Sequence, residues 1–126
     1  KEFNRILKVG GHVLITEGFM NELHGEPRDY WRFTPYGLSA LLLNSGFNVV
    51  SVSLLGGVFS VITQIFTRFM INSFSLYNHR FIGALFSRLF WFLGKVAIVL
   101  DRFLSTSANK KIGVDVIVLA EKKTDA

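Results

Sequence analysis

The sequence of 126 residues contains no cysteine, only two prolines and only three histidines. The absence of cysteine excludes disulfide bonds, thiolate nucleophiles and cysteine-ligated zinc, and it agrees with a reducing compartment. The histidines, His12, His24 and His79, lack the spacing of a metal-binding motif, so we predict that the chain holds no metal. The sequence also lacks internal repeats and low-complexity tracts.

Charged residues are scarce, and acidic residues are scarcer than basic ones. Charged residues make up 18% of the chain and hydrophobic residues 50%, including 13 phenylalanines, which argues against intrinsic disorder. The net charge of +5 is unevenly placed, because the stretch from Ser60 to Lys111 contains seven basic residues and a single acidic one, Asp101. This stretch is therefore predicted to meet an anionic partner.

The first residues do not form a signal-peptide pattern of basic, apolar and small-residue regions. Residues 1–7 read instead as the last turns of a helix, which Gly10 and Gly11 terminate. We therefore expect the chain to begin within a longer protein.

Apolar segments and turn residues alternate in a way that predicts an α/β fold. Thr34 is a predicted N-cap with Pro35 at the first helical position, and Gly46 suits a left-handed position after that helix. The nearly continuous apolar character of residues 12–17 predicts a strand covered on both faces. In chain order we expect a helix over 1–7, a strand over 12–17, a loop over 18–33, a helix over 34–45, a strand over 47–55, a helix from 58 to a connection at 72–78, a helix over 80–104, a polar turn over 105–111 and a strand over 113–120.

Residues 58–104 differ from the rest of the chain, because they predict two helices that are apolar over most of their surface. In the second helix Arg88, Lys95 and Arg102 recur every seven residues and form one narrow basic stripe. Such a hairpin can lie on a membrane surface, or it can pack on a missing half of the protein, a lid or a second subunit of a homo-oligomer. In the membrane interpretation, the residues that contact lipid headgroups or their boundary are Arg68, Arg88, Trp91, Lys95 and Arg102.

Two other partners for the hairpin are disfavoured. A complete membrane crossing over residues 81–100 would bring Arg88 and Lys95 into the bilayer, at a cost of roughly 2–3 kcal/mol each near its centre. Nucleic acid is not expected, because the helices are too apolar to follow a phosphate backbone and no RNA-binding motif is present.

Two short motifs carry a resemblance to a known family. They are Arg-Ile-Leu-Lys-Val-Gly-Gly at positions 5–11 and Asp-Tyr-Trp-Arg-Phe-Thr at positions 29–34. Together with the order of predicted elements, they resemble the C-terminal part of a class I S-adenosylmethionine-dependent methyltransferase of the methyltransferase type 11-like family. Val9 stands where that family usually has proline, which leaves the turn intact.

The resemblance implies the C-terminal portion of a Rossmann-like sheet, in which strands five, seven and six lie side by side and the last strand is antiparallel between the other two. Residues 1–57 would belong to the methyltransferase domain, residues 58–111 would be an apolar, basic helical insertion, and residues 112–126 would supply the final strand and tail. The segment would be the substrate side of an enzyme that transfers a methyl group to a small hydrophobic or lipid-linked acceptor.

The cofactor implied by the resemblance is S-adenosylmethionine, and the missing N-terminal half would bind most of it. No Gly-x-Gly-x-x-Gly run occurs, and neither Gly10–Gly11 nor Gly56–Gly57 is predicted to follow a strand as a cofactor loop does. We therefore assign no cofactor-binding residue to this segment and expect it to be inactive alone.

The loop over residues 18–33 is the predicted substrate site, since long loops in compact domains often carry function. His24 is a candidate general base, and the alternative is a histidine that only hydrogen-bonds the loop. Asp29 and Arg32 are expected to pair and fix the loop, with direct substrate binding as the alternative. The remaining substrate-side candidates are Glu17, Tyr30 and Trp31, which can also serve only solvation or packing.

A second class of function stays open at this point. The chain can be a non-catalytic, membrane-associated or protein-interaction module that retains a degenerate methyltransferase scaffold. In either case the expected location is the cytoplasm, with peripheral attachment to a membrane if the hairpin meets lipid.

Overall fold

The computed structural model describes residues 2–23 and 25–123, and the side chains of Tyr77 and Arg80 are left out of the description. The chain divides into two compact units. The sheet unit consists of Lys1–Phe19, Leu23–Leu55 and Asp115–Ala126. The hairpin unit consists of Met20–Glu22 and Gly56–Val114.

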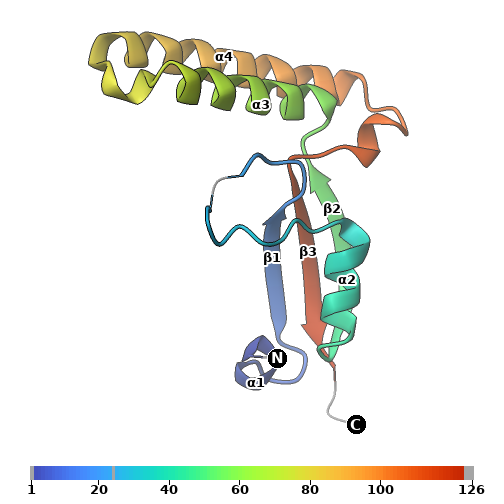
Figure 1. The fold of residues 1–126 in the computed structure, drawn as a ribbon. Helices are drawn as coiled ribbons and strands as arrows, with labels where there is room; N and C mark the ends of the chain where they lie inside the picture. Colours follow the sequence, from blue (N-terminus) through green and yellow to red (C-terminus); the bar gives the residue numbers. More distant parts are fainter. Residues whose placement is uncertain (1, 24, 124–126) are drawn as a thin grey trace. The chain divides into compact units, whose positions relative to one another are not determined.

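The sheet unit contains three strands, β1 (His12–Gly18), β2 (Phe47–Leu55) and β3 (Asp115–Lys122), in the order β1-β3-β2 (Figure 1). The last strand of the sequence lies in the middle and is antiparallel to both neighbours, so β1 and β2 run parallel to each other. The mixed α/β class and the central antiparallel position of the last strand are therefore confirmed.

Helix α2 (Pro35–Leu43) covers one face of this sheet, and the core of the unit lies between them. The helix begins as predicted, because the Thr34 Oγ1 accepts a hydrogen bond of 3.0 Å from the backbone N–H of Gly37 and Pro35 follows the cap. The side chains that share the core are Leu38, Leu42, Phe47, Val116, Val118 and Ala120.

Gly46 lies between α2 and β2 with a φ of +86°, as its predicted left-handed position requires. A Cβ at Gly46 would lie 2.6 Å from the Asn4 Nδ2. Asn4 belongs to the short helix α1 (Glu2–Ile6), and its side chain donates a hydrogen bond of 3.0 Å to the carbonyl of Ser45. The glycine thus permits both the turn and this contact.

The sheet face that α2 does not cover is exposed, which contradicts one prediction. Residues of β1 alternate in burial, and Leu14 is 67% exposed. Leu14 pairs with Leu119 of β3, and both point away from the face that α2 covers. The expectation that β1 is covered on both faces is therefore wrong for the described residues, because α2 packs on one face only.

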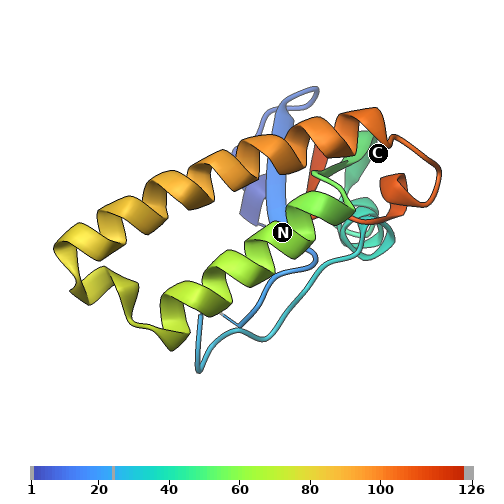
Figure 2. The ribbon, with the colours of Figure 1, turned by 90° about the horizontal axis from the view of Figure 1, so that it is seen from above.

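The hairpin unit is built on two helices, α3 (Val58–Ser73) and α4 (Arg80–Phe103), which run side by side in opposite directions (Figures 1 and 2). The short 3-10 helix η1 (Leu76–Asn78) lies in the predicted connection, and η2 (Asn109–Lys111) follows α4. Gly83 permits the tight return, because a Cβ there would lie 2.6 Å from the carbonyl oxygen of Leu76.

Candidate functional site

The loop that follows β1 starts at the carboxyl end of that strand and leads to the N-terminus of α2 (Figure 1). The backbone N–H of Phe33 donates a hydrogen bond of 3.2 Å to the carbonyl of Gly18, which brings the two ends of the loop together. A turn within it is closed by a hydrogen bond of 2.9 Å from the N–H of Arg28 to the carbonyl of Gly25. The candidate residues on this loop are thus held near one end of the sheet.

Asp29 and Arg32 form the ion pair that their spacing predicts. The Arg32 Nη2 lies 2.7 Å from the Asp29 Oδ2, and the Nη1 contacts the Oδ1, so the pair is bidentate. The Arg32 Nη1 also donates to the carbonyl of Trp31 at 2.9 Å, and Asp29 accepts from the N–H of Gly25 at 3.4 Å. These contacts make the pair a clamp that sets the path of the chain before α2.

Tyr30 and Trp31 lie between the two residues of this clamp in the sequence, and both are exposed. Their side chains are 73% and 74% exposed. Trp31 stacks on Phe33 with a centroid separation of 6.5 Å and an interplanar angle of 20°, and Phe33 in turn packs against the core. The loop therefore presents exposed aromatic rings, and Phe33 connects the ring of Trp31 to the core. Such a surface suits contact with an apolar or planar molecule.

Glu17 lies near the carboxyl end of β1, opposite Val116 of β3. It therefore shares the sheet face that α2 covers, and its side chain is exposed. His24, the predicted general base, lies outside the described residues. The structure thus brings Asp29 and Arg32 into contact.

Gly56 and Gly57 lie directly between β2 and α3, as the predicted strand and helix place them. However, the backbone N–H groups in the first turn of α3, which have no acceptor within the helix, already donate to side-chain oxygens. The Asp101 carboxylate accepts from the N–H of Phe59 at 3.0 Å and from that of Ser60 at 2.9 Å. A Cβ at Gly57 would lie 2.5 Å from the Asp101 Oδ1, so the described residues of this turn do not fit an anionic cofactor group.

Asp101 and Asn109 join the start of α3 to the end of α4, and we call Ser60, Asp101 and Asn109 the polar staple. The Ser60 hydroxyl donates to the Asp101 Oδ2 at 2.6 Å, and the Asn109 Oδ1 accepts from the N–H of Val58 at 2.7 Å. Burial of the Asp101 carboxylate raises its pKa, but hydrogen bonds from Ser60, Phe59 and Asn109 outweigh that effect and hold the pKa below its ordinary value.

The staple was missed by the sequence analysis, although its residues decide how the hairpin is closed. Ser60 and Asp101 are 41 positions apart, so no local spacing signals the contact. The sequence contains a weaker indication of this contact, because Asp101 is the only acidic residue between Ser60 and Lys111, on an otherwise basic helix. An isolated acidic residue in such a setting indicates a specific partner.

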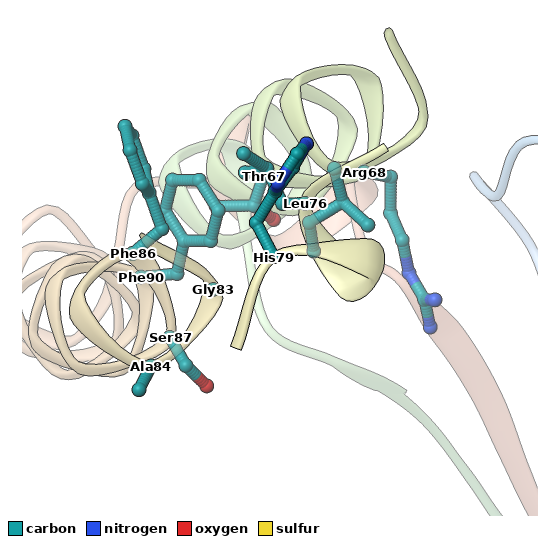
Figure 3. A pocket seen from close by; sticks show the side chains of 10 residues that line it. Thr67, Arg68, Leu76, His79, Gly83, Ala84, Phe86, Ser87 and Phe90 are labelled. Atoms are coloured by element: carbon teal, nitrogen blue, oxygen red, sulfur yellow. The ribbon is translucent and has the colours of Figure 1, made fainter. Parts of the chain in front are cut away.

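A groove of about 430 Å³ lies between the two helices near η1 (Figure 3). Its wall combines aromatic side chains such as Phe86 and Phe90 with the polar groups of Thr67, Ser87 and His79. Figure 3 shows the guanidinium of Arg68 directed away from those two aromatic rings. The groove offers an apolar slot with a polar rim, and no spacing of residues in the sequence predicts it.

The residues predicted to contact a membrane or partner are spread along the hairpin. Arg68 pairs with Glu22 at an Nε–Oε1 distance of 3.3 Å, which ties Met20–Glu22 to α3. The Lys95 Nζ lies 5.3 Å from the ring centroid of Trp91, one helical turn away. Arg88 and Arg102 are exposed.

One helix of the described residues, over Phe81–Phe103, is long and apolar enough to cross a membrane by length and composition. Only 6% of its most apolar 18-residue stretch is buried. The described part of the chain contains no group of three or more histidine, aspartate or glutamate side chains that could hold a metal ion.

No family model, no curated protein and no solved structure matches the chain.

Proposed function

We propose that the chain is the substrate-side part of an S-adenosylmethionine-dependent methyltransferase that acts on a small hydrophobic or lipid-linked acceptor. The observation that supports this most directly is the sheet, in which the last strand, β3, lies antiparallel between β1 and β2. This arrangement agrees with the C-terminal portion of a Rossmann-like methyltransferase sheet, to which the motifs at positions 5–11 and 29–34 are similar.

The position of the loop supports the same proposal. In open α/β sheets, ligands bind beyond the carboxyl ends of the strands, and the loop of residues 19–33 follows the carboxyl end of β1. The Asp29–Arg32 clamp would fix this loop, while Tyr30 and Trp31 would supply aromatic contact to an apolar acceptor. Methyl transfer depends chiefly on holding the acceptor in the correct orientation, which such a rigid aromatic surface can do.

The turn at Gly56 and Gly57 does not fit S-adenosylmethionine, because Asp101 occupies the start of α3 that follows the glycine pair. The proposal therefore assigns the cofactor pocket to sequence that precedes Lys1 in a longer chain. It requires a glycine-rich strand–loop–helix in that preceding sequence. If the coding sequence upstream lacks one, the proposal is wrong.

The direct test is calorimetric titration of S-adenosylmethionine into the full-length protein, with the 126-residue segment as the control. Micromolar binding by the full-length protein and none by the segment would support the proposal. Failure of the full-length protein to bind would overturn it. Binding by the segment alone would contradict the assignment of the pocket to preceding residues.

The alternative function is a non-catalytic module on a degenerate methyltransferase scaffold. The observation that favours it is that Asp29 and Arg32 bind each other in a bidentate pair, as a purely structural clamp does. This alternative predicts lipid or partner binding without cofactor binding by the full-length protein.

A further inference from the structure

Helix α4 carries a continuous apolar arc along its length. The members of this arc recur at intervals of three, four or seven residues, so they share one side of the helix. They are all exposed, by between 38% and 83%. The apolar arc consists of Ile82, Leu85, Leu89, Phe92, Val96 and Phe103.

The basic stripe of Arg88, Lys95 and Arg102 runs parallel to this arc on the same helix. Successive residues of an α-helix are rotated by about 100°, which places the stripe at the flank of the arc rather than opposite it. Asp101, the acidic residue of α4, is turned towards α3 and held by Phe59 and Ser60. The stripe is therefore a row of cations on α4 with no carboxylate of that helix beside it.

Helix α3 extends the apolar surface on one side of the hairpin. Met70 of α3 and Phe74, which follows that helix, line an apolar depression together with Ile82 and Phe86, so this surface joins the arc of α4 at Ile82. The groove near η1 includes Arg68, Thr67 and Ser87 beside its aromatic wall. The depression is therefore almost wholly apolar, whereas the groove adds a cation and two hydroxyl groups.

We infer that the hairpin is a monotopic membrane anchor that lies flat in one leaflet of an anionic bilayer. The apolar arc enters the boundary of the acyl chains, and the basic stripe meets phosphate groups of the lipid headgroups. The long side chains of Arg88, Lys95 and Arg102 reach the headgroup level from the flank of an embedded helix. This inference does not depend on methyl transfer, so it can fail or succeed separately from the proposed function.

Charge favours the surface of an anionic bilayer over two alternatives, a complete crossing of the bilayer and contact with a second copy of the chain. A complete crossing would place Arg88 and Lys95 inside the bilayer, whereas a surface position leaves both at the headgroups. A symmetric contact with a second copy would bring identical patches together, and the basic stripe offers no opposite charge to its own copy. An anionic lipid surface complements the arc and the stripe at the same time.

The first experiment measures sedimentation of the full 126-residue chain with vesicles of phosphatidylglycerol and of phosphatidylcholine. We expect tight binding to the anionic vesicles, and a loss on the order of 100-fold when Arg88→Glu, Lys95→Glu and Arg102→Glu are combined. The matched control is Lys8→Glu, Arg28→Glu and Lys123→Glu, which makes the same change in net charge on exposed residues of the sheet unit. We expect the control to bind at least 10-fold more tightly than the stripe variant.

The second experiment determines which side of α4 enters the lipid. Two proteins with one tryptophan each are compared in vesicles that contain brominated lipid. The first carries Trp31→Phe and retains Trp91 beside the basic stripe, and the second carries Trp31→Phe, Trp91→Phe and Phe92→Trp. We expect strong quenching of the tryptophan introduced at position 92, within the arc, and weaker quenching of Trp91.

Several results would overturn the inference. These are failure to bind either vesicle, equal binding to both vesicles with no effect of the stripe variant, or equal loss in the stripe variant and its control. Equal deep quenching at positions 91 and 92 would show a helix surrounded by lipid, and thus a crossing. Self-association through the arc without vesicle binding would identify a second copy as the occupant.

Discussion

The sheet unit contains a cluster of buried apolar side chains, whereas the hairpin unit leaves most of its large apolar side chains exposed. Phe47, Val116 and Val118 are no more than 1% exposed, and they pack with α2. Among the described residues of the hairpin unit, the buried apolar side chains are only Val61, Leu76 and Ala97. The large aromatic residues of α4, such as Phe81 and Phe103, are 88% and 83% exposed.

This difference shows that apolar residues stabilise the folded chain only where the fold buries them. Burial contributes roughly 25 cal/mol per Å² of apolar surface removed from water, and within the described residues only the sheet unit forms a cluster of buried apolar side chains. The hairpin has to be held by other means, and the hydrogen bonds of Ser60, Asp101 and Asn109 supply one of them. Its apolar surface remains available for an external partner.

The largest expected effect tests the difference in burial directly. Phe47→Ala should lower the free energy of unfolding by about 3–5 kcal/mol, because it removes a buried ring from the core. The same substitution at Phe81 should change it by less than about 0.5 kcal/mol in the absence of lipid. Urea denaturation followed by circular dichroism measures both, and equal effects would show that the two units do not differ as described.

The next effect concerns the polar staple. Asp101→Ala should destabilise the hairpin by about 1–3 kcal/mol, because it removes an acceptor from the start of α3. Amide hydrogen exchange of residues 58–61 measures this loss, and exchange in the core strand β3 serves as the control.

Acidification should reproduce part of this loss. Hydrogen bonds keep the pKa of Asp101 in the folded chain below the ordinary value of 3.8, so the unfolded chain takes up the proton first as the pH falls. The stabilisation is complete above that ordinary value and is lost as the pH falls through the folded pKa. Hairpin exchange in Asp101→Ala should lack this acid dependence, and an identical dependence in both proteins would assign it to other groups.

A smaller effect is expected in the candidate site. Asp29→Asn should weaken the bidentate clamp and reduce the local stability of the loop by about 1–2 kcal/mol. Faster amide exchange at Gly25 and Phe33 measures this change, and Glu26→Gln on the same loop is the control. If both variants exchange alike, the clamp does not hold the loop.

The smallest effect concerns the start of α2. Thr34→Ala should cost about 1 kcal/mol, because the N–H of Gly37 loses its side-chain acceptor. Thr34→Ser should retain most of the stability, since it preserves the hydroxyl. Thermal unfolding of the three proteins checks this order, and equal destabilisation by both variants would contradict the capping role.

Local signals predicted the elements of the sheet unit well. The strand predicted over residues 47–55 agrees with β2, and Thr34, Pro35 and Gly46 have the predicted roles at the two ends of α2. The last strand was predicted two residues too early, because β3 extends through Glu121 and Lys122. These polar residues are paired by register with His12 and Phe47, which local hydrophobicity does not report.

The candidate site was predictable only in part. The ion pair of Asp29 and Arg32 follows from their short spacing, and the exposure of Tyr30 and Trp31 agrees with their place on a loop. The contact between Ser60 and Asp101 joins distant positions, so it requires the fold before it can be seen. The same holds for the groove beside His79, whose wall comes from both helices and their connection.

The central position of β3 also has a consequence for the order of events during synthesis. Register pairs His12 with Glu121 and Phe47 with Lys122, so neither β1 nor β2 has a neighbour in this sheet until β3 has left the ribosome. Helices α3 and α4 precede β3 in the sequence and form through local contacts, which are fast. The nascent hairpin is therefore complete while the sheet is still incomplete. If the hairpin binds a bilayer as we infer, this attachment precedes closure of the sheet.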